Sequence, residues 1–539
     1  MVFSTSCGIK KSVNHLPDLQ NYNVEIPNVT LINDSTYRYK NNYLTKNKQQ
    51  LWELYIEGNP LQLGYNNGAL SQKLMQNQEK IFFSKVENLV PSPFNQKILR
   101  GFLKWYNRKM YVHIREEDQA EIFGLSQYSS HQYDFVAPRF QRNMYLHGAH
   151  DIGHAMQDLA MVGCSSLAVW GEYTEDGELL IGRNFDFYVG DEFAKNKVVS
   201  LVKPEVGIPY LAISWPGMVG VVSGMNKEGL TVTINAGKSK IPLAAKTPIS
   251  LVTREILENA KNIKEAIIIA KKRKVFVSES IMVGSALDKK AVLIEISPKN
   301  TGVYEVQNSS KLFCTNHFQS DEYKNDKRNN KQIAESHSEY RFEKLQELVN
   351  ANDKLNPESM AKILRDKSGL KGKEIGYGNE KALNQLLAHH AVIFSPEKKL
   401  VWVSSNPYQL GEFVCYDLDK IFANNSIQPN NQETTQLNIA RDPFLDTEGY
   451  KNYEEFRVQT ARFDGEEVLS EDFLKQYIAL NPNFWKTYYE VGKYHYLQKK
   501  YREAKANFEL ALTKEITTLH DRKSIEKYLN KIKKKSNER

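Results

Sequence analysis

Two short stretches, Val162-Gly163-Cys164-Ser165-Ser166 and Gly182-Arg183-Asn184-Phe185-Asp186, decide the fold prediction. The first opens an apolar run that ends at Tyr173, and the second closes another run that begins at Leu179. The turn-forming sequence Glu175-Asp176-Gly177-Glu178 separates the two runs. This pattern predicts a β-hairpin, whose paired strands bring Cys164, Arg183 and Asp186 to the same end of a sheet.

These residue types together suit nucleophilic catalysis by a thiol. A guanidinium group close to Cys164 lowers the pKa of a thiol from its free value of about 8.5. If the chain is cut before Cys164, the new α-amine, with an unperturbed pKa of about 7.7–8.0, can accept the thiol proton without a histidine. Asp186 would then hold this amine. Gly163 has no Cβ, which permits the close approach that such a cut requires.

Two further motifs follow in order along the chain. They are Gly224-Met-Asn-Lys-Glu-Gly229-Leu, with Asn235 after it, and Cys314-Thr-Asn316-His-Phe. Together with the hairpin motifs they resemble the penicillin-type acyl-CoA:6-aminopenicillanic acid acyltransferases and the choloylglycine hydrolases, which are cysteine N-terminal-nucleophile hydrolases. The resemblance covers the chain from Gly148 to Leu418. Several motifs in the family's order make it more specific than any one motif.

The resemblance implies that the chain cuts itself between Gly163 and Cys164. Cys164 is then the nucleophile, and its free amine is the base. By the same resemblance Arg183 neighbours the thiol and Asp186 binds the amine.

Three later residues complete the implied catalytic set. Asn235 would donate a hydrogen bond to the tetrahedral oxyanion, Asn316 would orient the amine, and Arg341 lies where the family has a later active-site arginine. No cofactor is implied. The implied substrates are small-molecule amides that join an acyl chain to an amine or amino acid, and the sequence leaves open whether the reaction is hydrolysis or acyl transfer.

The order of predicted strands and helices indicates an α+β protein. Strand groups on either side of a helix pair predict two sheets between helices, a four-layer α/β/β/α sandwich over residues 164–423. Residues 1–48 read as an irregular arm. Residues 49–163 read as a helical leader, because Leu51, Leu54 and Tyr55 recur at helical spacing.

Two segments follow the predicted catalytic domain. Residues 424–470 are expected to be a linker because they begin rich in Asn, Gln and Thr. Residues 471–539 are expected to be helical and to resemble a tetratricopeptide repeat, with an ordinary helical hairpin as the alternative. Either version predicts a docking or capping role for a protein partner. The residues close to the repeat positions are Tyr488, Val491, Gly492, His495, Ala504, Phe508 and Ala511.

Composition narrows the class of protein. Hydrophobic residues make up 41% of the 539 residues, and no apolar run approaches the roughly 18 residues of a membrane-spanning helix. Much of the net charge of +8 comes from lysine and arginine residues in the C-terminal tail, and this distribution does not indicate nucleic-acid binding. Four cysteines are too few for a disulfide framework, and Cys314 and Cys415 are expected to be buried.

The start of the chain leaves the location of the protein uncertain. Ser6-Cys7-Gly8 resembles the end of a bacterial lipoprotein signal, in which the cysteine carries a lipid anchor. A periplasmic or membrane-anchored lipoprotein would follow if the true start lies upstream. A chance match would leave the protein cytoplasmic.

Two other functions compete with the amide-cleaving enzyme. His150 and His154 are spaced to share one helical face, as in His-Glu-x-x-His zinc sites, with Asp151 in place of the glutamate. That spacing would suit a zinc-dependent hydrolase. The other alternative is a non-catalytic, lipid-anchored binding protein. The pair His389-His390 is expected to start a strand near the site.

Overall fold

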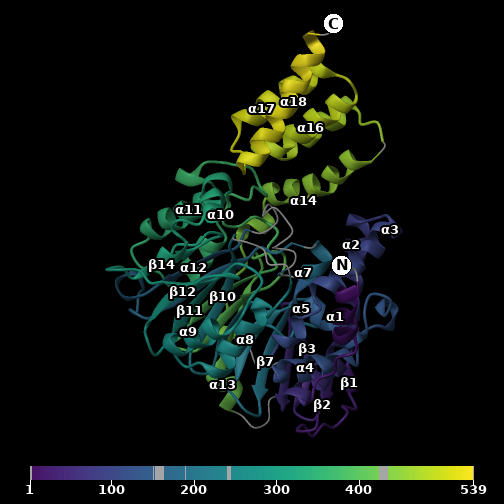
Figure 1. Ribbon diagram of the computed structural model, residues 1–539. Helices are drawn as coiled ribbons and strands as arrows, with labels where there is room; N and C mark the ends of the chain where they lie inside the picture. The colour runs from purple at the N-terminus through teal and green to yellow at the C-terminus, as the bar shows by residue number, and fades with distance from the viewer. Residues whose placement is uncertain are drawn as a thin grey trace.

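Two β-sheets and the helices around them form most of this computed structural model, which describes residues 3–149, 151, 163–188, 190–238, 244–423, 435–465 and 467–537 (Figure 1). The larger sheet has eleven strands among these residues, in the order β1 (Thr30–Asn33), β2 (Thr36–Tyr39), β3 (Asn42–Lys46), β4 (Trp52–Gly58), β7 (Val198–Pro204), β8 (Tyr210–Ser214), β9 (Ser223–Asn226), β10 (Leu230–Ala236), β11 (Glu279–Ser285), β12 (Lys290–Ile296) and β13 (Thr301–Tyr304). The smaller sheet has six, in the order β14 (Lys311–Cys314), β5 (Ser165–Val169), β6 (Leu180–Phe185), β15 (His390–Ser395), β16 (Leu400–Ser404) and β17 (Phe413–Asp417).

The helices fall into three groups along the chain. The N-terminal group is α1 (Phe3–Val13), α2 (Pro60–Leu89), α3 (Pro93–Tyr106), α4 (Glu116–Ser126) and α5 (Arg139–His147). The group within and directly after the sheets is α7 (Asp191–Lys195), α8 (Ile249–Asn259), α9 (Ile263–Lys272), α10 (Lys327–Glu335), α11 (Ser338–Asn350), α12 (Pro357–Leu364) and α13 (Leu418–Ala423). The C-terminal group is α14 (Glu448–Thr460), α15 (Glu471–Leu480), α16 (Trp485–Leu497), α17 (Tyr501–Thr513) and α18 (Leu519–Asn537). None of the described helices is long and apolar enough to cross a membrane.

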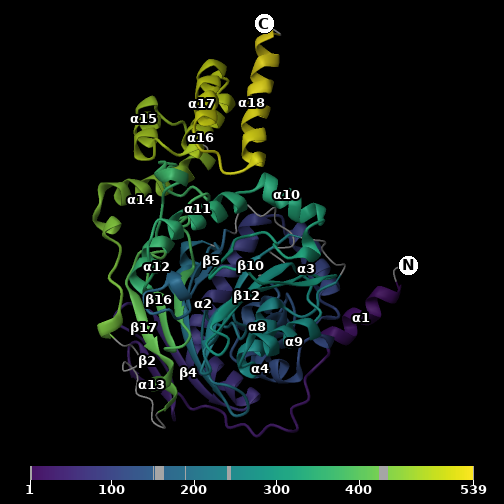
Figure 2. The same ribbon diagram turned by 90° about the vertical axis from the view of Figure 1, so that its left-hand side faces the viewer.

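The hydrophobic cores show how the sheets and helices pack. One cluster draws buried side chains from both sheets, including Leu211 of β8 and Val403 of β16. A second cluster joins β10 and β11 of the larger sheet to α8 and α9. A third joins the smaller sheet to α11 and α12. The sheets therefore share a core, and each packs helices against its other face, as the two views of the ribbon also show (Figures 1 and 2).

The C-terminal helices form a separate group with its own core. Helices α14 to α18 project from one end of the two sheets (Figures 1 and 2). Gly492 of α16 lies against Phe508 of α17, where an added Cβ would be 2.9 Å from the ring. The small residue lets these two helices cross closely.

The prediction of an irregular arm over residues 1–48 is wrong. Residues 3–13 form α1, and residues 30–46 form the three antiparallel strands β1 to β3. Successive side chains of β3 point to opposite faces of the sheet, as in any strand. Tyr43 packs into the core between the sheets, and Leu44 packs into the core on the other face. The Asn- and Tyr-rich composition hid this alternation.

The helical spacing of Leu51, Leu54 and Tyr55 is also misleading, since Trp52–Gly58 is strand β4. Strand β4 pairs in parallel with β7, from Trp52 opposite Val198 to Gly58 opposite Pro204. Both of its faces are buried, so it reads as a continuous apolar run that cannot be told from a helix by periodicity. A partner far along the chain decides the conformation.

Two segments near the end of the predicted catalytic domain differ in secondary structure from the prediction. The sequence over residues 380–387 also predicts a helix, but this described stretch is an irregular loop. Side chains of Asn379 and Asn384 accept hydrogen bonds from backbone N–H groups two residues ahead, which competes with a helix. The linker expected over residues 424–470 contains α14, whose Tyr453 and Phe456 are buried in the C-terminal core; residues 424–434 lie outside the described part.

Candidate active site

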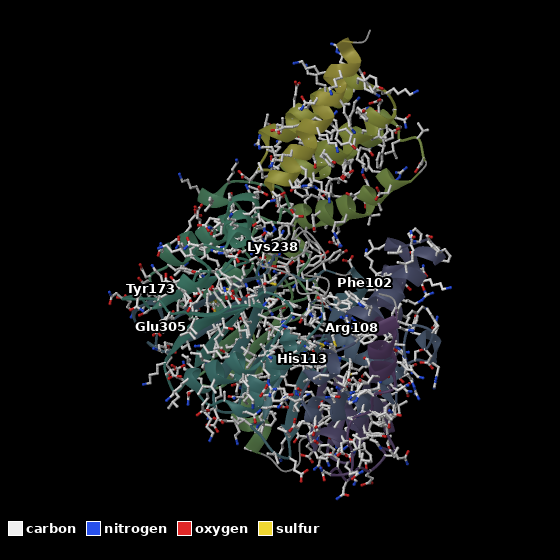
Figure 3. The ribbon with its side chains drawn as sticks, viewed as in Figure 1. Phe102, Arg108, His113, Tyr173, Lys238 and Glu305 are labelled. Carbon is white, nitrogen blue, oxygen red and sulfur yellow. The ribbon has the colours of Figure 1, made fainter. Side chains whose placement is uncertain are left out.

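Cys164 lies directly before β5 and is 1% exposed. The predicted hairpin is confirmed, because β5 and β6 pair antiparallel with Ser165 opposite Asn184 and Ser166 opposite Arg183. This register brings the thiol, Arg183 and Asp186 to one end of the smaller sheet. In Figure 3, Lys238, three residues after Asn235, lies just below the C-terminal helices, whereas Tyr173 and Glu305 lie far to one side.

Arg183 is fixed beside the thiol. Its Nη2 lies 3.9 Å from Cys164 Sγ and also donates to the carbonyl of Ile234. Its Nη1 donates to the carbonyl of Val222 at 3.1 Å, and its guanidinium carbon lies 4.2 Å from the ring centroid of Phe185. Acceptors on the larger sheet therefore hold a cation that belongs to the smaller sheet.

The thiol is not poised as a thiolate in the uncut chain. Burial raises the pKa of Cys164 to about 11, although Arg183 and a backbone hydrogen bond from Asp186 act in the opposite direction. Arg183 lowers the pKa of this thiol, as expected, but removal of the thiol from water outweighs one guanidinium. The thiol needs a base to lose its proton.

The side chain of Asp186 is fully buried at the end of β6. Neither of its side-chain oxygens has a hydrogen-bond partner among the described residues. Burial raises the pKa of Asp186 to about 7, and the nearby charges of Arg341 and Arg183 limit the rise. The main-chain N–H of Gly163 donates to the carbonyl of Asp186 at 3.4 Å. The main chain of Asp186 therefore lies beside Gly163, and its side-chain oxygens have no hydrogen-bond partner in the described part of the chain.

Arg341, on α11, connects the nucleophile to the later motifs. Its Nη1 donates to the Cys164 carbonyl at 2.7 Å and to Ser165 Oγ at 2.8 Å. Its Nη2 donates to Asn316 Oδ1 at 2.6 Å. Burial lowers the pKa of this guanidinium to about 10. The side chain is fully buried and fixes the main chain of Cys164.

The two predicted asparagines also come to this end of the sheets. Asn235, on β10, accepts from Ser166 Oγ at 2.8 Å and donates to the carbonyl of Cys314 at 3.2 Å. Asn316 donates to the carbonyl of Ala236 at 3.0 Å. All six predicted site residues are therefore buried and linked around Cys164, across the junction of the two sheets.

One residue that touches the Gly163–Cys164 bond was not predicted. Gln385 donates from Nε2 to the carbonyl oxygen of Gly163 at 2.9 Å and is 1% exposed. It lies in the loop that was expected to be a helix. The nearby Gly376, Gly378 and asparagines are typical of a loop, but no pattern in the sequence connects Gln385 to Gly163.

A hydrogen-bonded pair of histidines is linked to Arg183 through the hydroxyl of Ser223. His390 starts β15, as expected, and its Nε2 is 2.9 Å from Ser223 Oγ, which also accepts a hydrogen bond from Arg183. Its Nδ1 is 2.9 Å from Nδ1 of His389. Burial lowers the pKa of both histidines well below the usual value, so both are neutral at pH 7.

The remaining residues singled out from the sequence are two buried cysteines, the candidate zinc ligands and Cys7. Cys415 and Cys314 are fully buried and free of disulfides, as expected. His150 and His154, the candidate zinc ligands, lie outside the described residues, as does the side chain of Cys7. Asp151 accepts from the backbone N–H of Ile249 at 2.8 Å, at the start of α8.

Residues 173–406 match the family model of acyl-coenzyme A:6-aminopenicillanic acid acyl-transferase. The resemblance that the motifs predict is therefore confirmed. The matched region contains every predicted site residue except Cys164, which precedes it. The match does not favour the zinc-dependent hydrolase or the binding protein.

Individual relatives are distant. An uncharacterized protein from Archaeoglobus fulgidus is 24% identical over 266 residues, which covers 45% of this chain and 43% of the relative, less than half of its length. Two similar solved structures are the Caenorhabditis elegans N-acylethanolamine-hydrolyzing acid amidase ortholog and a mutant conjugated bile acid hydrolase from Clostridium perfringens. The first is 19% identical, with 43% of this chain and 93% of that chain covered at a TM-score of 0.31. The second is 13% identical, with 48% and 93% covered at a TM-score of 0.33.

Proposed function

We propose that this protein is a cysteine N-terminal-nucleophile amidohydrolase or acyltransferase that cuts itself before Cys164. The observation that carries the proposal is the convergence of buried groups on the Gly163–Cys164 bond. Arg183 lies at the thiol, Arg341 holds the Cys164 carbonyl, and the carboxylate of Asp186 has no hydrogen-bond partner among the described residues. The family match supports the same chemistry.

In the self-cleavage step, Sγ of Cys164 attacks the carbonyl carbon of Gly163. The bond from this carbon to the Cys164 nitrogen breaks, and the nitrogen takes up the thiol proton. A thioester between Gly163 and Cys164 remains, and water hydrolyses it to a Gly163 carboxylate and a free thiol. The products are chains of 163 and 376 residues.

The cut supplies what the uncut site lacks. The new α-amine of Cys164 has an unperturbed pKa of about 7.7–8.0 and can accept the thiol proton at neutral pH. As an ammonium it would pair with Asp186, whose carboxylate it would keep ionised. Arg341 still holds the Cys164 carbonyl, which lies after the broken bond. The nucleophile therefore stays in place.

In turnover, the Cys164 thiolate attacks the carbonyl carbon of an N-acyl amide, and the amine leaves with a proton from the α-ammonium. The acyl group is then on sulfur. Attack by water gives hydrolysis, and attack by an amine gives transfer. Among the described residues, the carbonyl of Cys314 is the one acceptor for the Asn235 amide group, so its second amide proton can donate to the oxyanion.

The finer description of the fold is part of the proposal. We assign residues 164–423 to a four-layer α/β/β/α sandwich, a reading supported by the core that both sheets share and by the helices packed on each outer face. We assign the N-terminal 163 residues to a subunit retained after the cut. We also propose that the C-terminal helices form a tetratricopeptide-like segment, which the close crossing of α16 and α17 supports.

Intact mass measurement tests the proposal. The wild-type protein should give chains of 163 and 376 residues, and Cys164→Ala should give one chain of 539. The cut protein should release amines from a panel of N-acyl amines, and added hydroxylamine should capture the acyl group as a hydroxamate. A wild-type protein that stays uncut and is active would reject the mechanism.

A further inference from the structure

The geometry points to Gln385 as a catalytic residue of the self-cleavage step, the donor that stabilises the oxyanion on Gly163. This inference rests on the proposed function and adds a residue to it. Attack by the thiol turns the Gly163 carbonyl oxygen into an oxyanion, and the Nε2 of Gln385 already donates to that oxygen at 2.9 Å. A donor placed in a site without water stabilises a developing charge strongly.

The contact is specific to glycine at position 163. A Cβ at this position would lie within 2.6 Å of three atoms of the Gln385 amide group. Any larger residue would displace the amide from the carbonyl. The lack of a side chain at Gly163 therefore serves the approach of Gln385 and not only the flexibility of the backbone.

The loop that carries Gln385 is held on both sides. Asn184 of β6 donates to the carbonyl of Leu383 at 2.9 Å. On the other side, the hydroxyl of Tyr453, on α14, donates to the carbonyl of Leu386 at 3.2 Å, and Leu386 belongs to the C-terminal core. The C-terminal helices thus support the donor, which gives them a connection to the chemistry.

Gln385 is distinct from the groups assigned to turnover. Asn235 lies on β10 and is bonded to Ser166 and Cys314, whereas Gln385 is bonded to the residue before the nucleophile. The oxyanion of self-cleavage belongs to Gly163, and the oxyanion of turnover belongs to the substrate. The two steps can therefore use different donors.

The test follows the disappearance of the uncut chain by intact mass after a short pulse of expression. Gln385→Met keeps the side-chain length and removes the donor, so cleavage should slow by about 10²–10³-fold, the usual cost of one oxyanion donor. The matched control is Gln409→Met, because Gln409 is also a buried glutamine but its side chain has no partner among the described residues. This control should cleave at the wild-type rate.

A second variant guards against a simple folding defect. Gln385→Glu should cleave faster as the pH falls, because the protonated carboxyl group donates whereas the carboxylate repels the oxyanion. The wild type should show the opposite trend, since its thiol must lose a proton. Wild-type cleavage rates in Gln385→Met, or a wild-type pH trend in Gln385→Glu, would overturn the role of Gln385 alone. A wild-type chain that never cleaves would instead overturn the proposed function.

Discussion

The main-chain N–H of Gly163 donates to the carbonyl of Asp186 at 3.4 Å, so the bond proposed for cleavage lies beside the end of β6, where a buried carboxylate has no hydrogen-bond partner in the described part of the chain. Such a carboxylate costs stability while the chain is uncut. If the chain cuts itself as proposed, the new amine of Cys164 would become a partner for this carboxylate.

The stability of the uncut chain should therefore depend on the ionisation of Asp186. Its pKa is about 7 in the folded protein and about 3.9 in an unfolded chain, so the folded state holds the proton more tightly. The free energy of unfolding should fall as the pH rises from about 4 to 7, by about 1.4 kcal/mol for each unit of pKa difference. In the uncleavable Cys164→Ala background, Asp186→Asn should raise the melting temperature at pH 8 and leave it unchanged at pH 4.

Thermal melts at both pH values check this expectation. The control is Asp34→Asn, which changes an exposed aspartate between β1 and β2 and should leave both melting temperatures unchanged. Equal effects of Asp186→Asn at both pH values would show that the carboxylate is not a source of strain.

Arg341 should be needed for both activity and stability. It donates to the Cys164 carbonyl, Ser165 Oγ and Asn316 Oδ1, and Arg341→Met leaves these acceptors buried without the donor. We expect kcat/KM on an N-acyl amide to fall by at least about 100-fold and the free energy of unfolding to fall by about 3–5 kcal/mol.

Arg341→Lys should not restore activity, because a single ammonium cannot reproduce the planar fork that reaches three acceptors. Arg502→Met, at an exposed position on α17, is the control and should match the wild type in both measurements. A fully active Arg341→Lys enzyme would mean that only the charge is required.

The two chains should stay together after the cut. Strand β4 of the N-terminal region is paired in parallel with β7 over seven residues, and Arg115 of that region forms a salt bridge with Glu258 of α8 at 2.8 Å. Arg254 is also paired with Glu121 of α4. Loss of the N-terminal chain would expose a sheet edge and break buried ion pairs.

Gel filtration of the cut protein should give one peak that contains both the 163- and 376-residue chains. The chains should separate only in denaturant, and Arg254→Met should lower the denaturant concentration at which they part. Elution of an active 376-residue chain alone would contradict the prediction.

The crossing of α16 and α17 should depend on the absence of a side chain at Gly492. Gly492→Val places carbon atoms against Phe508, where even a Cβ would be 2.9 Å away, and overpacking of this kind costs about 1–3 kcal/mol. The variant should unfold at lower temperature and retain amide-cleaving activity. As a control, Gly101→Ala in α3 meets no atom within 4 Å and should stabilise the protein by up to about 1 kcal/mol.

The positions of the candidate site residues were easier to predict from the sequence than the secondary structure of the N-terminal region. Cys164, Arg183 and Asp186 are on one hairpin, so local pairing was enough to bring them together. Strand β4 was misread as a helix because its partner β7 lies more than a hundred residues away and both of its faces are buried. Pairing with a strand so far along the chain leaves no recognisable pattern in the residues of β4 themselves.

The sequence by itself determined the chemistry available to this protein: a thiol after a glycine, with an arginine and an aspartate on the returning strand. Only the tertiary structure decided the environment of these groups. Burial gives the thiol a high pKa, and packing of the chain brings Gln385 to the Gly163 carbonyl. It also leaves the Asp186 side chain without a hydrogen-bond partner among the described residues. The physical reason is that desolvation and a contact across more than 200 residues depend on how the whole chain packs, whereas a hairpin depends only on its own residues.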